Sequence, residues 1–187
     1  MGVVQERYAR AFEHPAPYEV HYSSALHEPI RHSRVDFERD EVSVDLAVQM
    51  VETRDRGVTL VGPPPGSLFG AVPWHAYINA LEADFNRVRP LLMEKPVYAI
   101  LNASRILHGT TGKTMSVLNK DEAAVWALQT APRMYHSVIN DALQIYRGTK
   151  SADDVVFEER DIIALREYVR ERSQAAFARA SDDGEEE

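Results

Sequence analysis

The sequence predicts a mainly α-helical protein, a helical bundle of about five or six helices with a short N-terminal strand remnant. Three observations lead to this fold class. Apolar residues recur at helical spacing in most segments after Asp45. Prolines stand where several helices would begin, and glycines stand where several would end. Period-two alternation, the sign of a strand, is confined to short stretches.

The first 23 residues differ from the rest and resemble the end of another domain followed by a linker. Val3-Val4 is a short apolar strand remnant with no obvious pairing partner. Pro15-Ala16-Pro17 then forces an extended connection into the alternating segment from Tyr18 to Tyr22. We therefore predict three regions: residues 1–23 as domain end and linker, 24–177 as a helical domain, and 178–187 as a disordered acidic tail.

The helical region divides at its prolines and glycines. Predicted helices run from Asp45 to Gly57, from Pro73 to Pro90, from Pro96 to Gly112, onward from Asn119, from Pro132 to Gly148, and from about Asp153 to Phe177. Asn119 is a good N-cap, and Glu122 stands at the capping-box position. Val58–Val61 is either a lone strand or a buried loop. The last helix is expected to bury Val156 and Ile163 among its apolar residues.

Composition excludes several classes of function. The 187 residues include no cysteine, which removes disulfides and thiolate chemistry and is compatible with the cytoplasm. The net charge of −8 argues against a nucleic-acid binder, and no apolar run is long enough for a membrane helix. The seven histidines show no paired metal-ligand spacing, and we find no serine-hydrolase elbow, P-loop or dinucleotide fingerprint.

The polar segment that leads into Asn119 and Lys120 is the best candidate for a binding site. It ends at a helix N-terminus, where unpaired backbone N–H groups and the helix dipole favour an anion. Lys120 would lie in the first turn, where a cation is unfavourable unless a phosphate is near. On these grounds alone an ordinary surface lysine is the better explanation of Lys120, and Tyr146 at the end of the next helix is better explained by packing or a rim contact.

Several motifs resemble those of the C-terminal domain of the streptomycin/spectinomycin (aminoglycoside 3''-) adenylyltransferases. They follow the family pattern SRI…TGK…KDxAAxWA…AxxxYxG at Ser104–Leu107, Thr111–Lys113, Asn119–Leu128 and Ala142–Gly148. Four further matches occur in the same order, at Pro15–Ser23, Val44–Ala47, Leu60–Pro63 and Leu68–Pro73, so that the similarity covers roughly residues 3–150. No single motif is diagnostic, but their order and spacing make the resemblance specific.

The resemblance implies an enzyme that transfers AMP from ATP to an antibiotic hydroxyl, with Mg²⁺ as a second cofactor. It implies that Lys120 contacts ATP phosphate, that Tyr146 packs at the nucleotide, and that Asp45 lies near the ATP site. The paired metal-binding aspartates and the catalytic glutamate of the family are absent from this sequence. We therefore name no catalytic or metal-binding residue and expect no adenylylation by this chain alone.

The resemblance also bears on the acceptor, an aminoglycoside-type cationic molecule. The segment Arg89–Pro96 lacks the Trp and Asp with which streptomycin-modifying members grip their drug, which favours a spectinomycin-like acceptor. Glu94 is the carboxylate there that would meet an ammonium group. A non-catalytic helical module that binds a ligand or a partner remains the alternative, and self-association through an uncovered apolar face is a further expectation.

Overall fold

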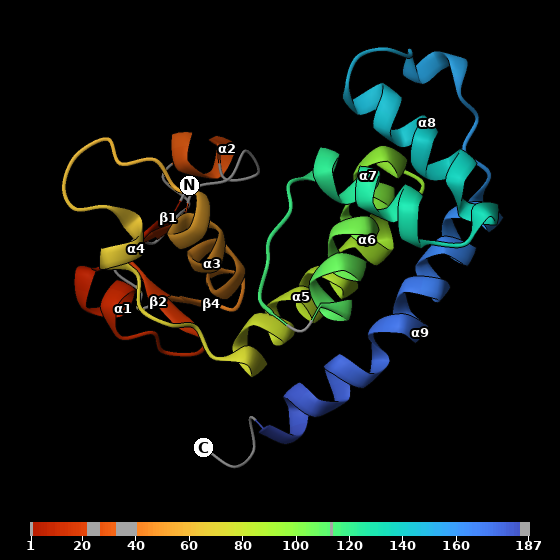
Figure 1. Cartoon of the computed structure of the whole chain (residues 1–187). Coiled ribbons are helices and arrows are strands. Elements are labelled where there is room, and N and C mark those ends of the chain that lie inside the picture. Colours follow the sequence, from red (N-terminus) through yellow and green to blue (C-terminus); the bar gives the residue numbers. More distant parts are fainter. Residues whose placement is uncertain (1, 22–26, 33–40, 113, 184–187) are drawn as a thin grey trace. The chain divides into compact units, whose positions relative to one another are not determined.

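The computed structural model describes residues 2–21, 27–32, 41–112 and 114–183 (Figure 1). They belong to two compact units, Met1–Ala80 and Leu81–Glu187. The described part is mainly α-helical, which confirms the predicted fold class. Its six helices of eleven or more residues agree with the predicted number, whereas three helices of four or five residues were not predicted.

Unit 1 combines short strands with short helices. In chain order it contains β1 (Gly2–Val3), α1 (Glu6–Arg10), β2 (Ala16–Tyr18), β3 (Val20–His21), α2 (His27–Arg31), β4 (Glu41–Ser43), α3 (Leu46–Arg56) and α4 (Pro65–Leu68). The strands form two antiparallel pairs, β1 with β3 and β2 with β4. Val3 lies opposite Val20, so the prediction that the N-terminal strand has no partner is wrong. The partner strand lies within the alternating segment that begins at Tyr18, but alternation does not identify the segment with which a strand pairs.

The longest complete helix of unit 1 is α3, which begins after Asp45 as predicted. It buries Leu46, Ala47, Met50 and Val51, a stripe that returns after one turn of helix. Its last turn ends at Gly57, whose backbone N–H donates to the Thr53 carbonyl at 2.8 Å. The apolar stripe therefore supplies much of the buried surface of this unit.

The segment Val58–Val61 differs from its prediction, because it is neither a strand nor buried. Val58, Leu60 and Val61 are 83%, 92% and 95% exposed. The proline-rich turn that follows directs the chain into α4 without a neighbouring strand to pair with this segment. A β-branched run of four residues indicates a strand only where a partner is available.

Unit 2 is built from helices. The boundary between the units falls within α5 (Trp74–Val88), and the chain continues through η2 (Arg89–Leu91), α6 (Pro96–Thr111), α7 (Lys120–Thr130), η3 (Arg133–Tyr135), α8 (His136–Tyr146), η4 (Ala152–Asp154) and α9 (Glu159–Asp183). The predicted starts of helices after Pro73, at Pro96 and after Asn119 agree with this order. No described helix is both long enough and apolar enough to cross a membrane.

The central element of unit 2 is α6, which contacts α7, α8 and α9 (Figure 1). Ile100 and Leu101 in its second turn are fully buried. Near its C-terminal end, the buried hydroxyls of Thr110 and Ser173 lie 2.6 Å apart and join α6 to α9. A helix that is covered on several faces gives a firm support for side chains at its ends.

Two helix ends in unit 2 confirm predicted signals. The backbone N–H of Glu122 donates to Asn119 Oδ1 at 2.9 Å, and the Glu122 carboxylate accepts from the Asn119 N–H at 3.1 Å. This is the reciprocal capping box that was expected at the start of α7. Gly148, just after α8, has φ of +71°, a conformation that favours glycine and explains the stop there.

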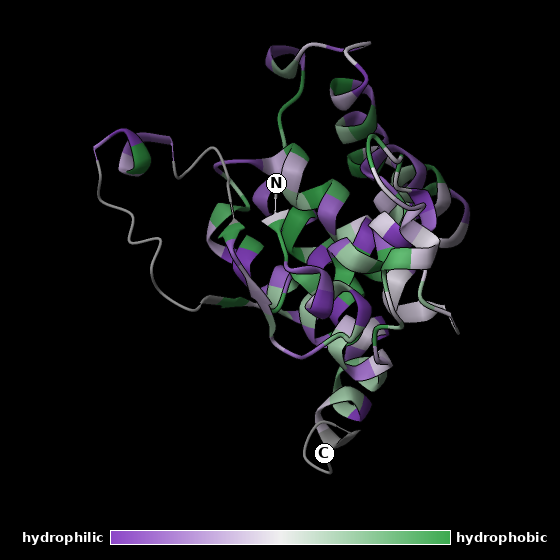
Figure 2. Ribbon diagram, turned by 90° about the vertical axis from the view of Figure 1, so that its left-hand side faces the viewer, coloured by the Kyte–Doolittle hydropathy of each residue, from purple (hydrophilic) through white to green (hydrophobic). Residues whose placement is uncertain are grey.

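The last helix lies further along the chain than predicted. It runs from Glu159 to Asp183, and hydrophobic and hydrophilic residues alternate around its turns (Figure 2). Val156 precedes it and is 85% exposed, and Ile163 is 42% exposed, so both were wrongly expected in the core. A buried stripe through Ile162, Leu165 and Val169 takes their place.

The structure groups the chain into two units that divide at Ala80/Leu81. The three regions suggested by the sequence, 1–23, 24–177 and 178–187, stay a prediction. The start of the predicted acidic tail, residues 178–183, is helical, and residues 184–187 lie outside the described part. Helix α9 continues there because Ala180 still belongs to its buried stripe.

Candidate functional site

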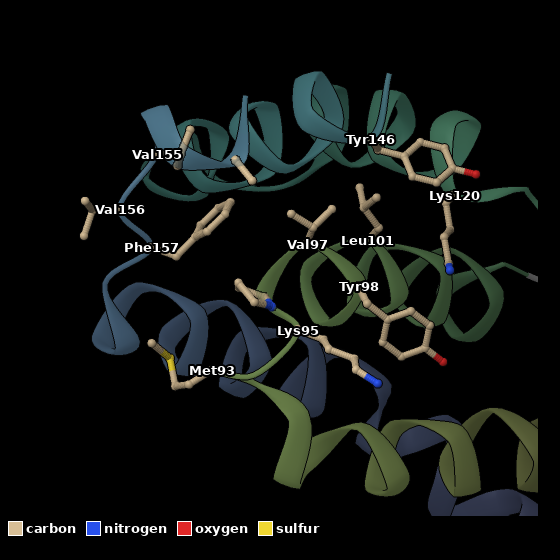
Figure 3. A pocket seen from close by; sticks show the side chains of 12 residues that line it. Met93, Lys95, Val97, Tyr98, Leu101, Lys120, Tyr146, Val155, Val156 and Phe157 are labelled. Atoms are coloured by element: carbon tan, nitrogen blue, oxygen red, sulfur yellow. The ribbon is translucent and has the colours of Figure 1, made fainter. Parts of the chain in front are cut away.

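A pocket of about 660 Å³ lies in unit 2 where the ends of three helices meet the segment that follows α8 (Figure 3). Its volume is in the range of small-molecule sites. The walls come from the start of α6, the start of α7, the end of α8 and residues 152–157. The lining residues are Met93, Lys95, Pro96, Val97, Tyr98, Leu101, Lys120, Tyr146, Ala152, Val155, Val156 and Phe157.

Lys120 is the first residue of α7, and its side chain reaches the aromatic ring of Tyr98 on α6. The ammonium lies 4.4 Å from the ring centroid, within the range of a cation–π contact. Burial lowers the pKa of Lys120 from its ordinary value, and the positive charge of Arg105 lowers it further. Asp84 acts in the opposite sense but does not cancel these effects. Burial and the nearby positive charge both disfavour the protonated lysine, and a bound anion would offset these effects.

Arg105 also lies on α6 and brings a second positive charge near Lys120. Its Nε atom is buried and has no hydrogen-bond partner among the described residues. A buried guanidinium N–H without an acceptor is costly and is satisfied when an anion or a water binds. Lys120 and Arg105 together therefore favour negative charge at the start of α7.

An ion pair holds the start of α7 against the end of α8. Arg147 Nη2 donates to Asp121 Oδ1 at 2.7 Å, and Arg147 Nε contacts the other carboxylate oxygen. The hydrogen bond from Arg147, with its charge, lowers the pKa of the Asp121 carboxyl below its ordinary value. Because Asp121 follows Lys120 and Arg147 follows Tyr146, this bidentate pair keeps the two pocket residues close together.

The structure brings together two of the four residues proposed from the sequence. Lys120 and Tyr146, 26 positions apart in the chain, line the same pocket. Glu94 is not among its lining residues, although its two chain neighbours are. Asp45 is the N-cap residue of α3 and belongs to unit 1, so its assignment to the nucleotide site stays a prediction.

Sequence reasoning missed Tyr98, Lys95 and the role of Arg105. Tyr98 lies 22 positions before Lys120, a separation at which no spacing rule applies. Lys95 directly precedes Pro96, which starts a helix, and a lysine at such a boundary is an ordinary surface residue. Arg105 was noticed as part of the SRI motif, but only the fold turns its side chain toward Lys120.

The pocket does not fit a resident metal ion. Its charged lining residues are both lysines, whereas Mg²⁺ prefers carboxylate and other oxygen ligands. Elsewhere in the described ranges there is no group of three or more His, Cys, Asp or Glu side chains that could hold a metal. The arrangement is suited to binding an anion that has an apolar part.

Comparison with known proteins places these features in a family. Residues 67–172 match the family described as "Aminoglycoside adenylyltransferase, C-terminal domain". The chain is 35% identical over 119 residues to an aminoglycoside (3'') (9) adenylyltransferase from Klebsiella pneumoniae, covering 60% of this chain and 43% of that protein. A protein of the same name from Rhizobium radiobacter is 32% identical over 141 residues, covering 72% and 48%.

A solved structure shares the fold. The spectinomycin adenyltransferase from Enterococcus faecialis, crystallised with ATP and spectinomycin, matches with a TM-score of 0.73 at 16% identity. The match covers 92% of this chain and 67% of that one. The present chain spans somewhat less than half the length of the two adenylyltransferases above. Because the family's C-terminal domain matches more than half of the chain, the chain belongs to the aminoglycoside adenylyltransferase family.

Proposed function

We propose that this chain supplies the nucleotide-binding C-terminal domain of an adenylyltransferase that moves AMP from ATP to a hydroxyl of an aminoglycoside-type antibiotic. One observation carries the proposal: Lys120 and Tyr146 line one pocket whose size suits a nucleotide. The motif resemblance independently implies a nucleotide contact for both residues. Because ATP is the proposed donor of AMP, we also propose that the protein acts in the cytoplasm.

Lys120 would hold a phosphate group of ATP. Its ammonium lies in the first turn of α7, and its pKa is lowered mainly by burial and then by Arg105. A bound phosphate would relieve the repulsion between these cations and would gain from the helix dipole. In the absence of nucleotide, the same charges weaken the fold, so the residue contributes to binding at the expense of stability.

Tyr146 would pack against the nucleotide. Its side chain is 53% exposed at the end of α8, and Figure 3 shows it on the same side of the pocket as Lys120. A large aromatic side chain left half-exposed beside a cation offers a surface for a planar base or a ribose. The ion pair between Asp121 and Arg147 keeps it in place beside α7.

ATP fits the residues of this pocket, whereas Mg²⁺ does not. When bound, the metal would orient the nucleotide phosphates and stabilise the displacement at phosphorus. The chain's own contribution is to bind and orient the nucleotide: Lys120 and Arg105 attract the phosphates, and the apolar wall formed by Val97 and Phe157 excludes water. No side chain of this pocket is assigned to proton transfer.

For the acceptor we propose a spectinomycin-like compound rather than streptomycin. The short segment between η2 and α6 contains no Trp or Asp that could grip a larger drug. Relatives named spectinomycin 9-adenylyltransferase, such as the protein from Campylobacter jejuni at 24% identity over 128 residues, support this choice. From the motif resemblance alone, we also propose that Asp45 lies near the nucleotide.

The test is ATP binding to the purified chain by isothermal titration calorimetry. We expect Lys120→Gln to weaken binding by about 10- to 100-fold, the range for losing a charged hydrogen bond. Tyr146→Ala should weaken it less. Arg172→Gln is the control, because this exposed arginine of α9 has the same charge and does not line the pocket.

A second measurement separates loss of binding from loss of fold. Without nucleotide, Lys120→Gln should raise the thermal midpoint, since it removes a cation that burial and Arg105 disfavour. A variant that binds less and melts higher marks a binding residue. The proposal is wrong if the chain binds no ATP, or if Lys120→Gln leaves the affinity unchanged.

A further inference from the structure

The pocket that contains Lys120 has two chemically different ends (Figure 3). At one end, Val155, Val156 and Phe157 form an apolar wall. At the other end, Lys95 and Lys120 extend toward the ring of Tyr98. The lining includes no carboxylate, so the two lysine charges are not balanced within it. A ligand that matches this pocket has an apolar or aromatic part at one end and negative charge at the other.

Lys95 is the less obvious of the two cations. It precedes Pro96 and adopts a non-helical backbone conformation, with φ of −135° and ψ of 61°. Its side chain therefore leaves the start of α6 toward the pocket, where it is a lining residue. Its ammonium lies 3.9 Å from Glu94 Oε1, and the two side chains are 58% and 66% exposed. A solvent-exposed pair at that separation holds its partners weakly.

We propose that Lys95 is a second anion anchor, which contacts the phosphate chain of the nucleotide at the same end of the pocket as Lys120. The inference rests on the proposed function, because it takes the bound molecule to be a nucleotide. Lys120 then holds one end of the phosphate chain and Lys95 another part of it. The adenine lies toward Phe157, where the wall is apolar.

Two cations at one end of the pocket make its affinity depend on the number of phosphates. In the proposed arrangement a triphosphate would contact both lysines, whereas a monophosphate would contact one of them. Adenosine carries no negative charge, so the Lys95 side chain should not affect its affinity. The same charges should repel a polycationic aminoglycoside from this pocket, so the acceptor approaches from elsewhere.

The inference reverses the role that the sequence suggested for Glu94. A carboxylate 3.9 Å from the Lys95 ammonium competes with phosphate for that cation. Replacing it should make ATP binding slightly stronger. A Glu94 that binds an ammonium group of the acceptor would have no such effect on ATP.

The experiment measures binding of ATP, ADP, AMP, adenosine and inorganic tripolyphosphate to the full chain without divalent cations. We expect Lys95→Gln to weaken ATP binding about three- to fivefold, as for one solvent-accessible charged contact. The factor should fall from ATP to AMP and vanish for adenosine. Lys95→Arg should keep the affinity, Glu94→Gln should not lower it, and Arg172→Gln is the control for net charge.

The outcomes separate this inference from the proposed function. If Lys120→Gln weakens ATP binding and Lys95→Gln does not, Lys95 is no anchor and the proposed function stands. An equal loss for ATP and adenosine in Lys95→Gln would show a structural effect and would also overturn the inference. If the chain binds tripolyphosphate through both lysines but binds no ATP, the anion site is real and the nucleotide assignment fails.

Discussion

The two units of the chain reach compactness by different means. Unit 1 relies on strands of two or three residues and on helices of which the longest complete one has eleven residues. Unit 2 surrounds α6, a helix of 16 residues, with α7, α8 and the 25-residue α9. Long helices bury continuous apolar stripes, whereas short elements bury isolated residues.

The difference bears on how the residues of the candidate site are supported. Three of its walls are the ends of α6, α7 and α8, whose middles are buried, so the side chains of those walls start from a firmly packed backbone. Binding residues on such supports keep their geometry better than residues on loops. In unit 1 the largest exposed apolar side chains instead lie together in one loop, at Val58, Leu60 and Val61. The following predictions test this contrast, beginning with the largest effect.

Removing a central side chain of unit 2 should have the largest effect. Ile100 is fully buried on α6, and Ile100→Ala should lower the free energy of unfolding by about 2–5 kcal/mol through lost packing and the resulting cavity. The matched variant in unit 1 is Val61→Ala, at a residue 95% exposed, which should change it by less than about 0.5 kcal/mol. Urea unfolding followed by circular dichroism measures both. Similar losses in the two variants would contradict the contrast.

Disrupting the buried hydroxyl pair between α6 and α9 should have the second largest effect on stability. Thr110→Val leaves the Ser173 hydroxyl without its partner at 2.6 Å, which should cost about 1–3 kcal/mol. The double variant Thr110→Val with Ser173→Ala removes both polar groups and should cost less than the sum of the single changes. Additive losses in this double-mutant cycle would show that the pair does not act as a unit.

The capping box at the start of α7 should contribute less to stability than the buried hydroxyl pair. Asn119→Ala removes the acceptor of the Glu122 N–H and should lower stability by about 1 kcal/mol. Asn119→Ser keeps a capping oxygen and serves as the control. Because Lys120 follows directly, Asn119→Ala should also weaken ATP binding, whereas the serine variant should not. Equal behaviour of both variants would argue against a role for the cap.

The smallest effect concerns acid stability through the exposed pair of Asp121 and Arg147. The folded pKa of Asp121 is below its ordinary value of 3.8, chiefly because Arg147 donates a hydrogen bond to it. Its contribution is therefore complete above that ordinary value and is lost as the pH falls through the lower folded pKa. Asp121→Asn should reduce this loss between neutral and acid pH, measured as the change in thermal midpoint. An unchanged pH dependence would contradict the assignment.

Local chemistry in the sequence predicted several helices in both units. Pro96 has a fixed φ that suits the first turn of a helix, so the start of α6 could be predicted. Asn119 and Glu122 are three residues apart, and their mutual hydrogen bonds need nothing but local backbone. The periodic apolar stripe of α3 likewise belongs to a single segment. Each of these signals depends on residues within a few positions of one another.

Other features depended on partners that are distant in the chain. The strand pair of Val3 and Val20 and the exposure of Val58–Val61 depend on whether another segment lies alongside. Val156 was expected inside because it is apolar, yet η4 and the turn after it leave it at the rim of the pocket. Short apolar runs carry too little periodicity to decide such cases.

The candidate site shows both kinds of information. The sequence by itself determined a capped helix start with Lys120 in its first turn, because a cap is a local structure. Only the tertiary structure decided that Tyr98, Lys95 and Tyr146 share a pocket with that lysine, and that Arg105 lowers its pKa. The physical reason is that burial and charge–charge interaction depend on distances between helices, which no spacing along one helix specifies.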